Sequence, residues 1–157
     1  MAATTSATVT QPAIISISGT TTNLSCNSVC TGAINITVSG GTSPFTYSWS
    51  NSSTNEDVSS LCSGSYTLTI TDANSCTSSS PFTITQPTAI VLTPSSVNAS
   101  CGNANGSASI SVTGGTSPYT YNWSNGATTQ TIIGLGAGNY YVTITDANGS
   151  TAMCSFS

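Results

Sequence analysis

Apolar and polar residues alternate along most of this chain in short runs. Ile34, Ile36 and Val38 alternate with polar residues, and so do Leu68 and Ile70 in a later run. A period of two places successive side chains on opposite faces of an extended strand, so each run predicts a half-buried β-strand. Further strands are expected around residues 15–17, 45–49, 58–61 and 82–84. No window of useful length has the period of a helix, so we expect almost no helix.

The whole pattern occurs twice. Residues 40–50 read GGTSPFTYSWS, and residues 114–124 read GGTSPYTYNWS. In each copy Gly-Gly and Pro mark a turn, and the aromatic residues that follow share one face of a strand. Six or seven short strands per copy, joined by Gly, Pro, Asn and Asp turns, are typical of a β-sandwich. The fold class predicted is all-β: two tandem immunoglobulin-like β-sandwich repeats, stapled by disulfides.

A second repeated segment sets the boundaries of the units. Residues 8–12 read TVTQP and residues 83–87 read TITQP, 75 positions later. We therefore expect residues 1–12 to be the tail strand of a preceding repeat or a donated strand, residues 13–87 to form repeat 1, and residues 88–157 to form repeat 2. Repeat 2 stops at Ser157, where repeat 1 continues to Pro87, so its last strand is expected to be truncated. Because Pro stiffens the junction and no Gly/Ser linker separates the units, a stiff head-to-tail rod is expected.

The charge composition excludes several kinds of function. The 157 residues contain no Lys, Arg or His, and the acids are Glu56, Asp57, Asp72 and Asp146. A chain without cationic side chains is a poor partner for nucleic acid or for an anionic membrane. General acid–base and nucleophilic catalysis also have almost no candidates, so we expect no enzyme, no catalytic residue and no cofactor. Residues 1–12 lack the pattern of a signal peptide, and no apolar run approaches the length of a membrane helix.

Six cysteines are available to staple two units of modest size. Four cysteines in one unit allow three connectivities, but the second unit helps to choose among them. Cys30 and Cys62 align with Ala104 and Gly136, so both positions lose sulfur together, as bonded partners would. The predicted pairs are Cys26–Cys76, Cys30–Cys62 and Cys101–Cys154. A zinc site made of the four cysteines of unit 1 is the alternative, and it is weaker because unit 2 keeps only two cysteines.

The acids Asp72 and Asp146 begin turns that read Asp-Ala-Asn-Ser and Asp-Ala-Asn-Gly. These are residues that a hairpin turn needs. Calcium is the alternative interpretation and makes both acids weak metal candidates, since one carboxylate per turn is few for an ion that takes six to eight oxygens. Tyr66 and Tyr140 stand at the start of a late strand, where the hydroxyl either anchors a corner or is the wet tip of a core residue.

Seven Asn-x-Ser/Thr sequons occur in this chain, which is rich in Asn, Ser and Thr: Asn23, Asn35, Asn51, Asn98, Asn105, Asn122 and Asn148. Chance accounts for most of them, because a sequon alone is only a hypothesis. Asn51 and Asn148, in predicted loops, are the better candidates for glycosylation.

The order of these motifs resembles the SprB repeat. The resemblance rests on the Gly-Gly-Thr-Ser-Pro strand, the Leu-Cys-Ser-Gly-Ser-Tyr segment at residues 61–66, the Asp-Ala-Asn turn and the Thr-Ile-Thr-Gln-Pro segment. This family forms long tandem arrays in surface adhesins of Bacteroidetes, among them a gliding-motility adhesin. The resemblance implies an extracellular, immunoglobulin-like module exported by the type IX route, with no catalytic residues to transfer. Ala104, Gly136 and Ser150 depart from the cysteine pattern of the repeat.

Three functions are weighed on this basis. The leading one is a structural repeat segment of an extracellular adhesin or filament, acting as a rigid stalk beside neighbouring repeats or identical subunits. In a sharper form, residues 4–10 complete the sheet of another subunit by strand donation, against the alternative of an array cut in mid-repeat. A glycan- or surface-binding module is the third, since Tyr, Trp and Asn can contact sugars. No partnership with nucleic acid and no insertion into a membrane are expected.

Overall fold

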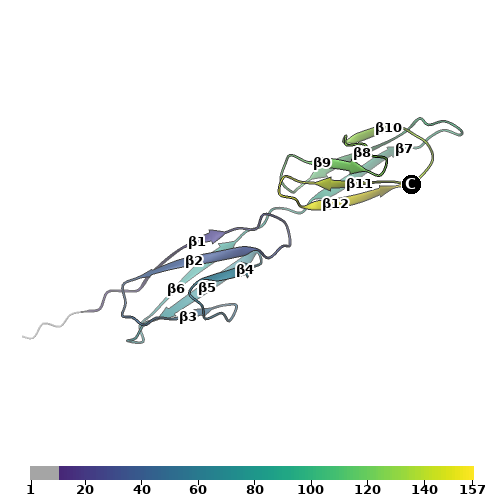
Figure 1. Cartoon of the computed structure of the whole chain (residues 1–157). Helices are drawn as coiled ribbons and strands as arrows, with labels where there is room; N and C mark the ends of the chain where they lie inside the picture. The colour runs from purple at the N-terminus through teal and green to yellow at the C-terminus, as the bar shows by residue number, and fades with distance from the viewer. Residues whose placement is uncertain (1–10) are drawn as a thin grey trace, which may run out of the picture. The chain divides into compact units, whose positions relative to one another are not determined.

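The structure is a computed structural model, and it describes residues 11–157 (Figure 1). Those residues form twelve β-strands and no helix, which confirms the predicted all-β class. The first unit contains β1 (Ser16–Thr22), β2 (Gly32–Ser39), β3 (Thr46–Trp49), β4 (Val58–Leu61), β5 (Gly64–Thr71) and β6 (Thr77–Ile84). The second contains β7 (Val91–Val97), β8 (Gly106–Thr113), β9 (Thr120–Trp123), β10 (Thr131–Leu135), β11 (Tyr140–Thr145) and β12 (Thr151–Phe156).

Each unit has two antiparallel sheets of three strands with the same topology. In unit 1 the orders are β1-β2-β4 and β3-β5-β6, and in unit 2 they are β7-β8-β10 and β9-β11-β12. The last hairpins differ in length. β5 and β6 pair from Thr71 opposite Thr77 as far as Gly64 opposite Ile84, whereas β11 and β12 stop at Tyr140 opposite Phe156. The end of unit 2 therefore lacks the final two pairs that close unit 1.

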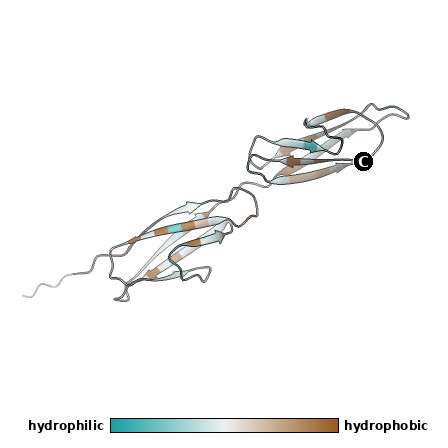
Figure 2. Cartoon of the chain, viewed as in Figure 1, coloured by the Kyte–Doolittle hydropathy of each residue, from teal (hydrophilic) through white to brown (hydrophobic). Residues whose placement is uncertain are grey.

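The inward faces of the two sheets in each unit share one core, which makes each unit a β-sandwich. In unit 2 the core combines residues of both sheets: Ala108, Ile110, Trp123, Ile132, Leu135, Val142, Ile144 and Phe156. In unit 1 the residues at seven of these positions are buried, and Ile84 is buried in addition: Ile34, Ile36, Trp49, Val58, Leu61, Leu68, Ile70 and Ile84. Figure 2 shows these apolar positions as brown bands that alternate with paler ones along the strands. Burial of alternate residues is what the period-two pattern predicts.

The two tryptophans fix the centre of each core. Trp49 and Trp123 are buried, and each indole Nε1–H donates to a backbone carbonyl, that of Asn55 at 2.9 Å and that of Thr129 at 2.7 Å. A buried indole needs such a partner, because its N–H cannot be left without a hydrogen bond at low cost. Trp49 also packs on Phe82, with ring centroids 5.8 Å apart. The aromatic strand predicted from the repeat is thus the strand that delivers the core tryptophan.

The Gly-Gly pairs of the repeat are required by the backbone. Gly40 and Gly41 have φ of 71° and 63°, in the left-handed region, and Gly114 and Gly115 have nearly the same values. A Cβ on Gly40 would lie 2.0 Å from the carbonyl oxygen of Ile14, so a larger residue would have to displace the backbone there. Tight turns of this kind bring the segment before β1 against the end of β2.

Four further residues with positive φ distinguish the units. Ser28, Ser52, Ser60 and Ser75 of unit 1 have φ between 57° and 69°, and the aligned residues of unit 2 are Gly102, Gly126, Gly134 and Gly149, all with positive φ. A non-glycine residue in the left-handed region is strained by about 1–2 kcal/mol. Unit 1 therefore carries turn strain that unit 2 avoids.

The chain divides into two compact units between Thr85 and Gln86, and the loop Leu24–Val29 groups with the second unit. Residues 1–10, on which most of the predicted tail or donated strand falls, lie outside the described residues. Within residues 11–157 no helix has the length and apolar character needed to cross a membrane.

Candidate functional site

The Asp72 carboxylate organises one end of unit 1. Its Oδ1 accepts hydrogen bonds from the backbone N–H groups of Asn74 and Cys76, both at 2.9 Å, and its Oδ2 accepts one from Thr42 at 3.0 Å. The side chain of Asn74 also donates to the Thr42 hydroxyl at 2.9 Å. This network ties the β5–β6 turn to the Gly-Gly turn that follows β2, so one acid connects the two sheets.

Unit 2 repeats the network around Asp146. Asn148 and Ser150 donate backbone N–H groups to Oδ1 at 2.9 and 2.8 Å, and Thr116 donates to Oδ2 at 3.0 Å. Asp72 and Asp146 are the buried polar side chains of the described residues. Two buried carboxylates with the same backbone donors in both copies indicate a structural function for this turn.

Burial and hydrogen bonding act in opposite directions on these acids. Burial raises the pKa of each carboxyl group, but the hydrogen bonds together lower it by more than burial raises it. The pKa of Asp72 and of Asp146 therefore lies below its ordinary value. The donors are Cys76, Thr42 and Asn74 for Asp72, with Thr116, Ser150 and Asn148 for Asp146. A carboxylate that accepts several amide hydrogen bonds is stabilised in its ionised form.

The calcium interpretation of the two acids stays a prediction, and the geometry gives it no support. Both oxygens of each carboxylate face N–H donors, whereas a calcium ion needs a shell of oxygen ligands. In residues 11–157, no cluster of three or more Cys, Asp or Glu side chains is arranged to hold a metal ion.

Tyr66, near the start of β5, and Tyr140, at the start of β11, each anchor a corner. This confirms one of the two interpretations given for them from sequence. The hydroxyl of Tyr66 donates to the Cys62 carbonyl oxygen at 3.0 Å, and that of Tyr140 donates to the Gly136 carbonyl oxygen at 3.3 Å. Each bond spans four residues and closes the segment that leads from the fourth strand into the fifth. This arrangement is the tyrosine corner known from immunoglobulin-like sandwiches.

Of the three predicted disulfides, the structure forms Cys30–Cys62. This bridge joins the residues before β2 and after β4, which are neighbours in the same sheet, where Gly32 pairs with Leu61. The absence of sulfur at both Ala104 and Gly136 correctly indicated that these two positions are partners. The bridge therefore reinforces one end of the sheet in unit 1 alone.

The other two predicted bridges, Cys26–Cys76 and Cys101–Cys154, are not formed in the structure, and all four thiols are free. Cys26 lies in the loop between β1 and β2, whereas Cys76 closes the Asp72 turn, which contacts the opposite end of β2. A strand of this length separates its ends by roughly 20 Å, too far for a disulfide.

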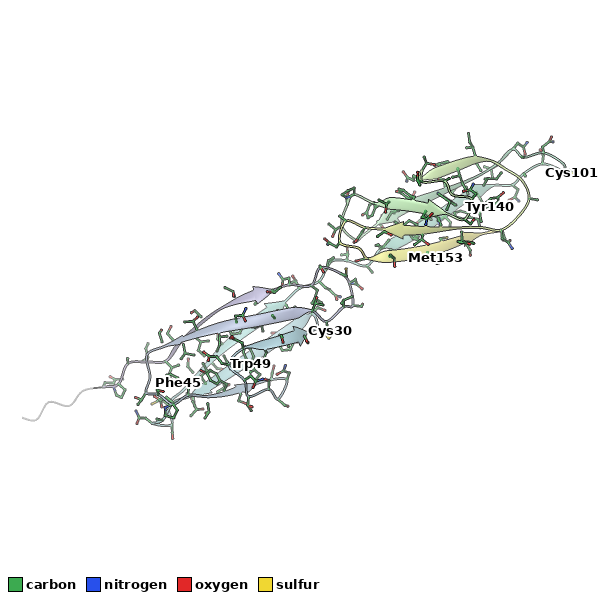
Figure 3. The ribbon with its side chains drawn as sticks, in the orientation of Figure 1. Cys30, Phe45, Trp49, Cys101, Tyr140 and Met153 are labelled. Carbon is green, nitrogen blue, oxygen red and sulfur yellow. A yellow bond between two sulfur atoms is a disulfide. The ribbon has the colours of Figure 1, made fainter. Side chains whose placement is uncertain are left out.

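The same error affects the pair predicted for unit 2. Cys101 is exposed at the tip of the β7–β8 loop, beyond the ends of the strands (Figure 3). Cys154 lies within β12, opposite Val142 of β11. Even spacing along a strand establishes which face a residue occupies, but not which end of the sandwich it reaches.

The two favoured sequons lie on the surface. Asn51 and Asn148 are exposed, each in a turn. The side-chain oxygen of Asn51 accepts a hydrogen bond from the Ser53 N–H at 3.2 Å, while the side-chain nitrogen of Asn148 donates to the Thr116 hydroxyl at 2.9 Å. The nitrogen that would carry a glycan is therefore engaged at Asn148, and glycosylation stays a prediction at both positions.

A pocket of about 310 Å³ lies at one end of unit 2 and is lined by residues of the β7–β8 loop and of the end of β12. Its walls come from the end of β7 and the loop after it, the start of β8, the β10–β11 connection and the end of β12; they include Asn98, Gly106, Gly138, Tyr140 and Phe156. No charged side chain lines it.

Unit 1 shows what fills the same place. Ile84, the last residue of β6, is almost completely buried, and its Cγ2 lies 2.8 Å from where a Cβ on Gly32 would be. Gly106, which lines the pocket of unit 2, is the counterpart of Gly32 as the first residue of the second strand. Phe156 and Ser157 align with Phe82 and Thr83, so the position of Ile84 has no counterpart among the residues of unit 2.

Sequence reasoning missed this pocket, although a signal was present. The comparison of the units showed that unit 2 ends before the Thr-Ile-Thr-Gln-Pro segment, but not that Ile84 alone fills a cavity. The importance of the small residues at this place was also missed, because in sequence Gly32 and Gly106 look like ordinary turn residues.

These features define the class: tandem six-stranded sandwiches in which Asp72 and Asp146, the two indoles and the corner tyrosines make hydrogen bonds within their own units. The SprB repeat profile matches residues 18–54 and 93–128, from the first strand to the turn after the third strand of each unit. Each unit therefore contains an SprB repeat, which makes the chain a repeat region of the cell-surface adhesin type. No curated protein matches the chain.

Proposed function

We propose that this chain is a passive structural segment of an extracellular adhesin or filament, a stalk that carries load and performs no reaction. The supporting observation is that the buried acids and the two tryptophans make their hydrogen bonds within their own units. Asp72 and Asp146 hold backbone amides, while Trp49 and Trp123 hold backbone carbonyls. Such groups stabilise a unit and leave little for a substrate.

Assembly forms the second part of the proposal. Copies of the chain join head to tail, with the segment before unit 1 of one copy completing a sheet of another by strand addition. The supporting observation is that the segment TVTQP before unit 1 repeats the segment TITQP at the end of unit 1.

A glycan-binding role has less support from the structure. The tryptophan rings, the usual platforms for sugars, are buried at 3% and 2% exposure. Among the exposed large hydrophobic residues of the described part of the chain, Tyr141 is the one aromatic residue. A glycan array with a saturable hit that is lost on changing loop residues would favour the binding module instead.

Single-molecule stretching tests the load-bearing role. We expect two separate force peaks, one for each sandwich. The Cys30–Cys62 bridge, whose residues are 32 positions apart, hides roughly 110 Å of chain from extension until it is reduced. A chain that extends smoothly with no force peak would contradict the proposed stalk, and trapping in oxidised and reduced buffer provides the internal control.

A further inference from the structure

Cys26 and Cys76 are not bonded to each other, and the surroundings of Cys26 indicate a different partner for each of them. We infer that a cysteine at the Cys26 position bonds to the cysteine at the Cys76 position of the next repeat in an array. In this chain Cys101 and Cys76 are two free halves of such bridges, and each takes the complementary cysteine of another SprB repeat. This inference rests on the head-to-tail arrangement proposed above and specifies its covalent joint.

The loop that carries Cys26 is part of the second compact unit. Leu24–Val29 groups with Gln86–Ser157, although it stands between β1 and β2 in sequence. Within this compact unit the side-chain amide of Asn27 donates to the Pro87 carbonyl oxygen at 3.0 Å. The loop cysteine of one repeat is therefore held in the compact unit of the next.

In that compact unit Cys26 lies against the Asp146 turn. Its thiol donates to the Asn148 carbonyl oxygen at 3.2 Å. A cavity of about 370 Å³ beside this contact is lined by both Cys26 and Ser150, and Ser150 comes two residues after Asn148. The thiol of Cys26 thus shares a cavity with the last residue of the turn.

Ser150 stands where unit 1 has Cys76. Both residues end the turn and donate a backbone N–H to its acid, at 2.9 Å for Cys76 and 2.8 Å for Ser150. The Ser150 hydroxyl oxygen is buried and has no hydrogen bond of good geometry within residues 11–157, although it lies close enough to the Asp146 carboxylate to lower its pKa. A thiol there would lose little, because sulfur hydrogen-bonds weakly, and it would bring a second sulfur to the cavity that Cys26 lines.

Cys101 and Cys76 are the loop cysteine and the turn cysteine that this chain leaves over. Cys101 follows the end of β7 by four residues, as Cys26 follows the end of β1. Cys101 is exposed at the tip of its loop (Figure 3), Cys76 is exposed at the end of its turn, and neither is bonded within residues 11–157. The loop cysteine of one copy is therefore complementary to the turn cysteine of another.

Formation of each bridge is an oxidation. Each thiol gives up its proton, the S–S bond forms, and the pair loses two electrons. An external disulfide such as oxidised glutathione accepts the two electrons and the two protons and becomes two thiols. The proposed extracellular location provides the oxidising conditions in which disulfides persist.

A single substitution in the full chain tests the pairing. Ser150→Cys supplies the missing sulfur, and Cys76 shows that the turn accommodates it. Ala147→Cys is the matched control, because it adds an exposed thiol to the same turn at a residue that does not line the cavity. Each variant is equilibrated with reduced and oxidised glutathione, digested with pepsin at low pH, where thiol exchange stops, and mapped by mass spectrometry.

We expect Ser150→Cys to form a bridge between Cys26 and residue 150. The effective concentration of its two thiols should exceed that in Ala147→Cys by about 100-fold or more, because the cavity holds the first pair together. Adding Cys26→Ser to Ser150→Cys should leave residue 150 unbridged.

Isotope mixing tests the pair that the wild-type chain carries. Equal amounts of unlabelled and isotope-labelled chains are oxidised together and mapped in the same way. We expect a Cys76–Cys101 product that joins labelled to unlabelled halves. Cys76→Ser and Cys101→Ser should each abolish this product, whereas Cys154→Ser should leave it unchanged, because Cys154 lies within β12.

The outcomes separate this inference from the proposed function. If Ser150→Cys bridges no better than Ala147→Cys, the inference is wrong whatever the copies do. If it forms its bridge but no Cys76–Cys101 product appears, the pairing stands and head-to-tail assembly of separate copies is wrong. A Cys76–Cys101 product without mixed halves, or a Cys101–Cys154 bridge, would contradict the inference.

Discussion

The Cys30–Cys62 bridge allows a quantitative test in which unit 2 provides the control. Unit 2 folds into the same sandwich with Ala104 and Gly136 at the two positions. The double substitution Cys30→Ala with Cys62→Gly therefore removes the bridge and leaves residues that the repeat already accommodates. The prediction is that unit 1 loses stability and unit 2 does not.

The size of the effect follows from the length of the closed loop. The bonded cysteines are 32 residues apart, and constraining a loop of that length in the unfolded chain stabilises the folded state by about 3.7 kcal/mol. With a urea slope of about 1 kcal/mol per molar, expected for so small a domain, the midpoint of unit 1 should fall by roughly 3 M or more. If the variant is unfolded in water, titration with an osmolyte brings the transition into range.

Fluorescence can follow each unit separately because each contains one tryptophan. In a Trp123→Phe background, Trp49 reports on unit 1, and a Trp49→Phe background reports on unit 2. Reduction of wild type should reproduce the effect of the double substitution, and reduction of the substituted chain should change nothing. A midpoint in unit 1 that moves by less than about 0.5 M would refute the reasoning. A further loss on reducing the substituted chain would reveal bridges among the four remaining cysteines.

Three other predictions concern single features of the turns and the core. The pKa of Asp72 and of Asp146 is lowered in the folded state, so both acids contribute stability above about pH 4, and this stability is lost as the pH falls below the ordinary Asp pKa and through the folded-state pKa. The melting temperature should therefore fall steeply with pH in that range. It should fall less steeply in a variant with both acids changed to Asn. Ser60→Gly should stabilise unit 1 by about 1 kcal/mol and Gly134→Ser should destabilise unit 2 by a similar amount, since both residues are left-handed; equal and opposite signs in urea titrations are the check, and two changes of the same sign would contradict it. Ile84→Ala should cost about 2–5 kcal/mol in unit 1, measured by Trp49 fluorescence, and a loss below 1 kcal/mol would mean that Ile84 does not fill its pocket.

The strands were predictable from sequence because one face of each is buried. Alternation around Ile34, Leu68 and Ile70 located β2 and β5, and even the short β4 was visible from Val58 and Leu61. The repeat strengthened every assignment, since a strand found in one unit was expected in the other. The alternation that predicts a strand is a local property of the sequence, and it arises because one face of each strand is buried.

The pairing of distant residues was less predictable. The alignment of the two units predicted a bridge between Cys26 and Cys76, yet Cys26 lies in the loop before β2 and Cys76 in the turn that contacts the end of β2. The left-handed backbone at Ser60, within β4, was also hidden, because only the aligned Gly134 indicates such a conformation. The pocket at Gly106 depends on the end of another strand, and its existence follows only once both sheets are placed together.

The Asp72 network has one consequence for how such repeats can diverge. The three hydrogen bonds that its carboxylate accepts from Thr42, Asn74 and Cys76 come from main-chain N–H groups, which a substitution cannot remove unless it introduces proline. Residues around the acid can therefore change, as Cys76 becomes Ser150 in the second copy, while the fastening between the sheets is kept. A gene encoding many such units could accumulate differences from copy to copy without weakening the hydrogen bonds that connect the two sheets of each unit.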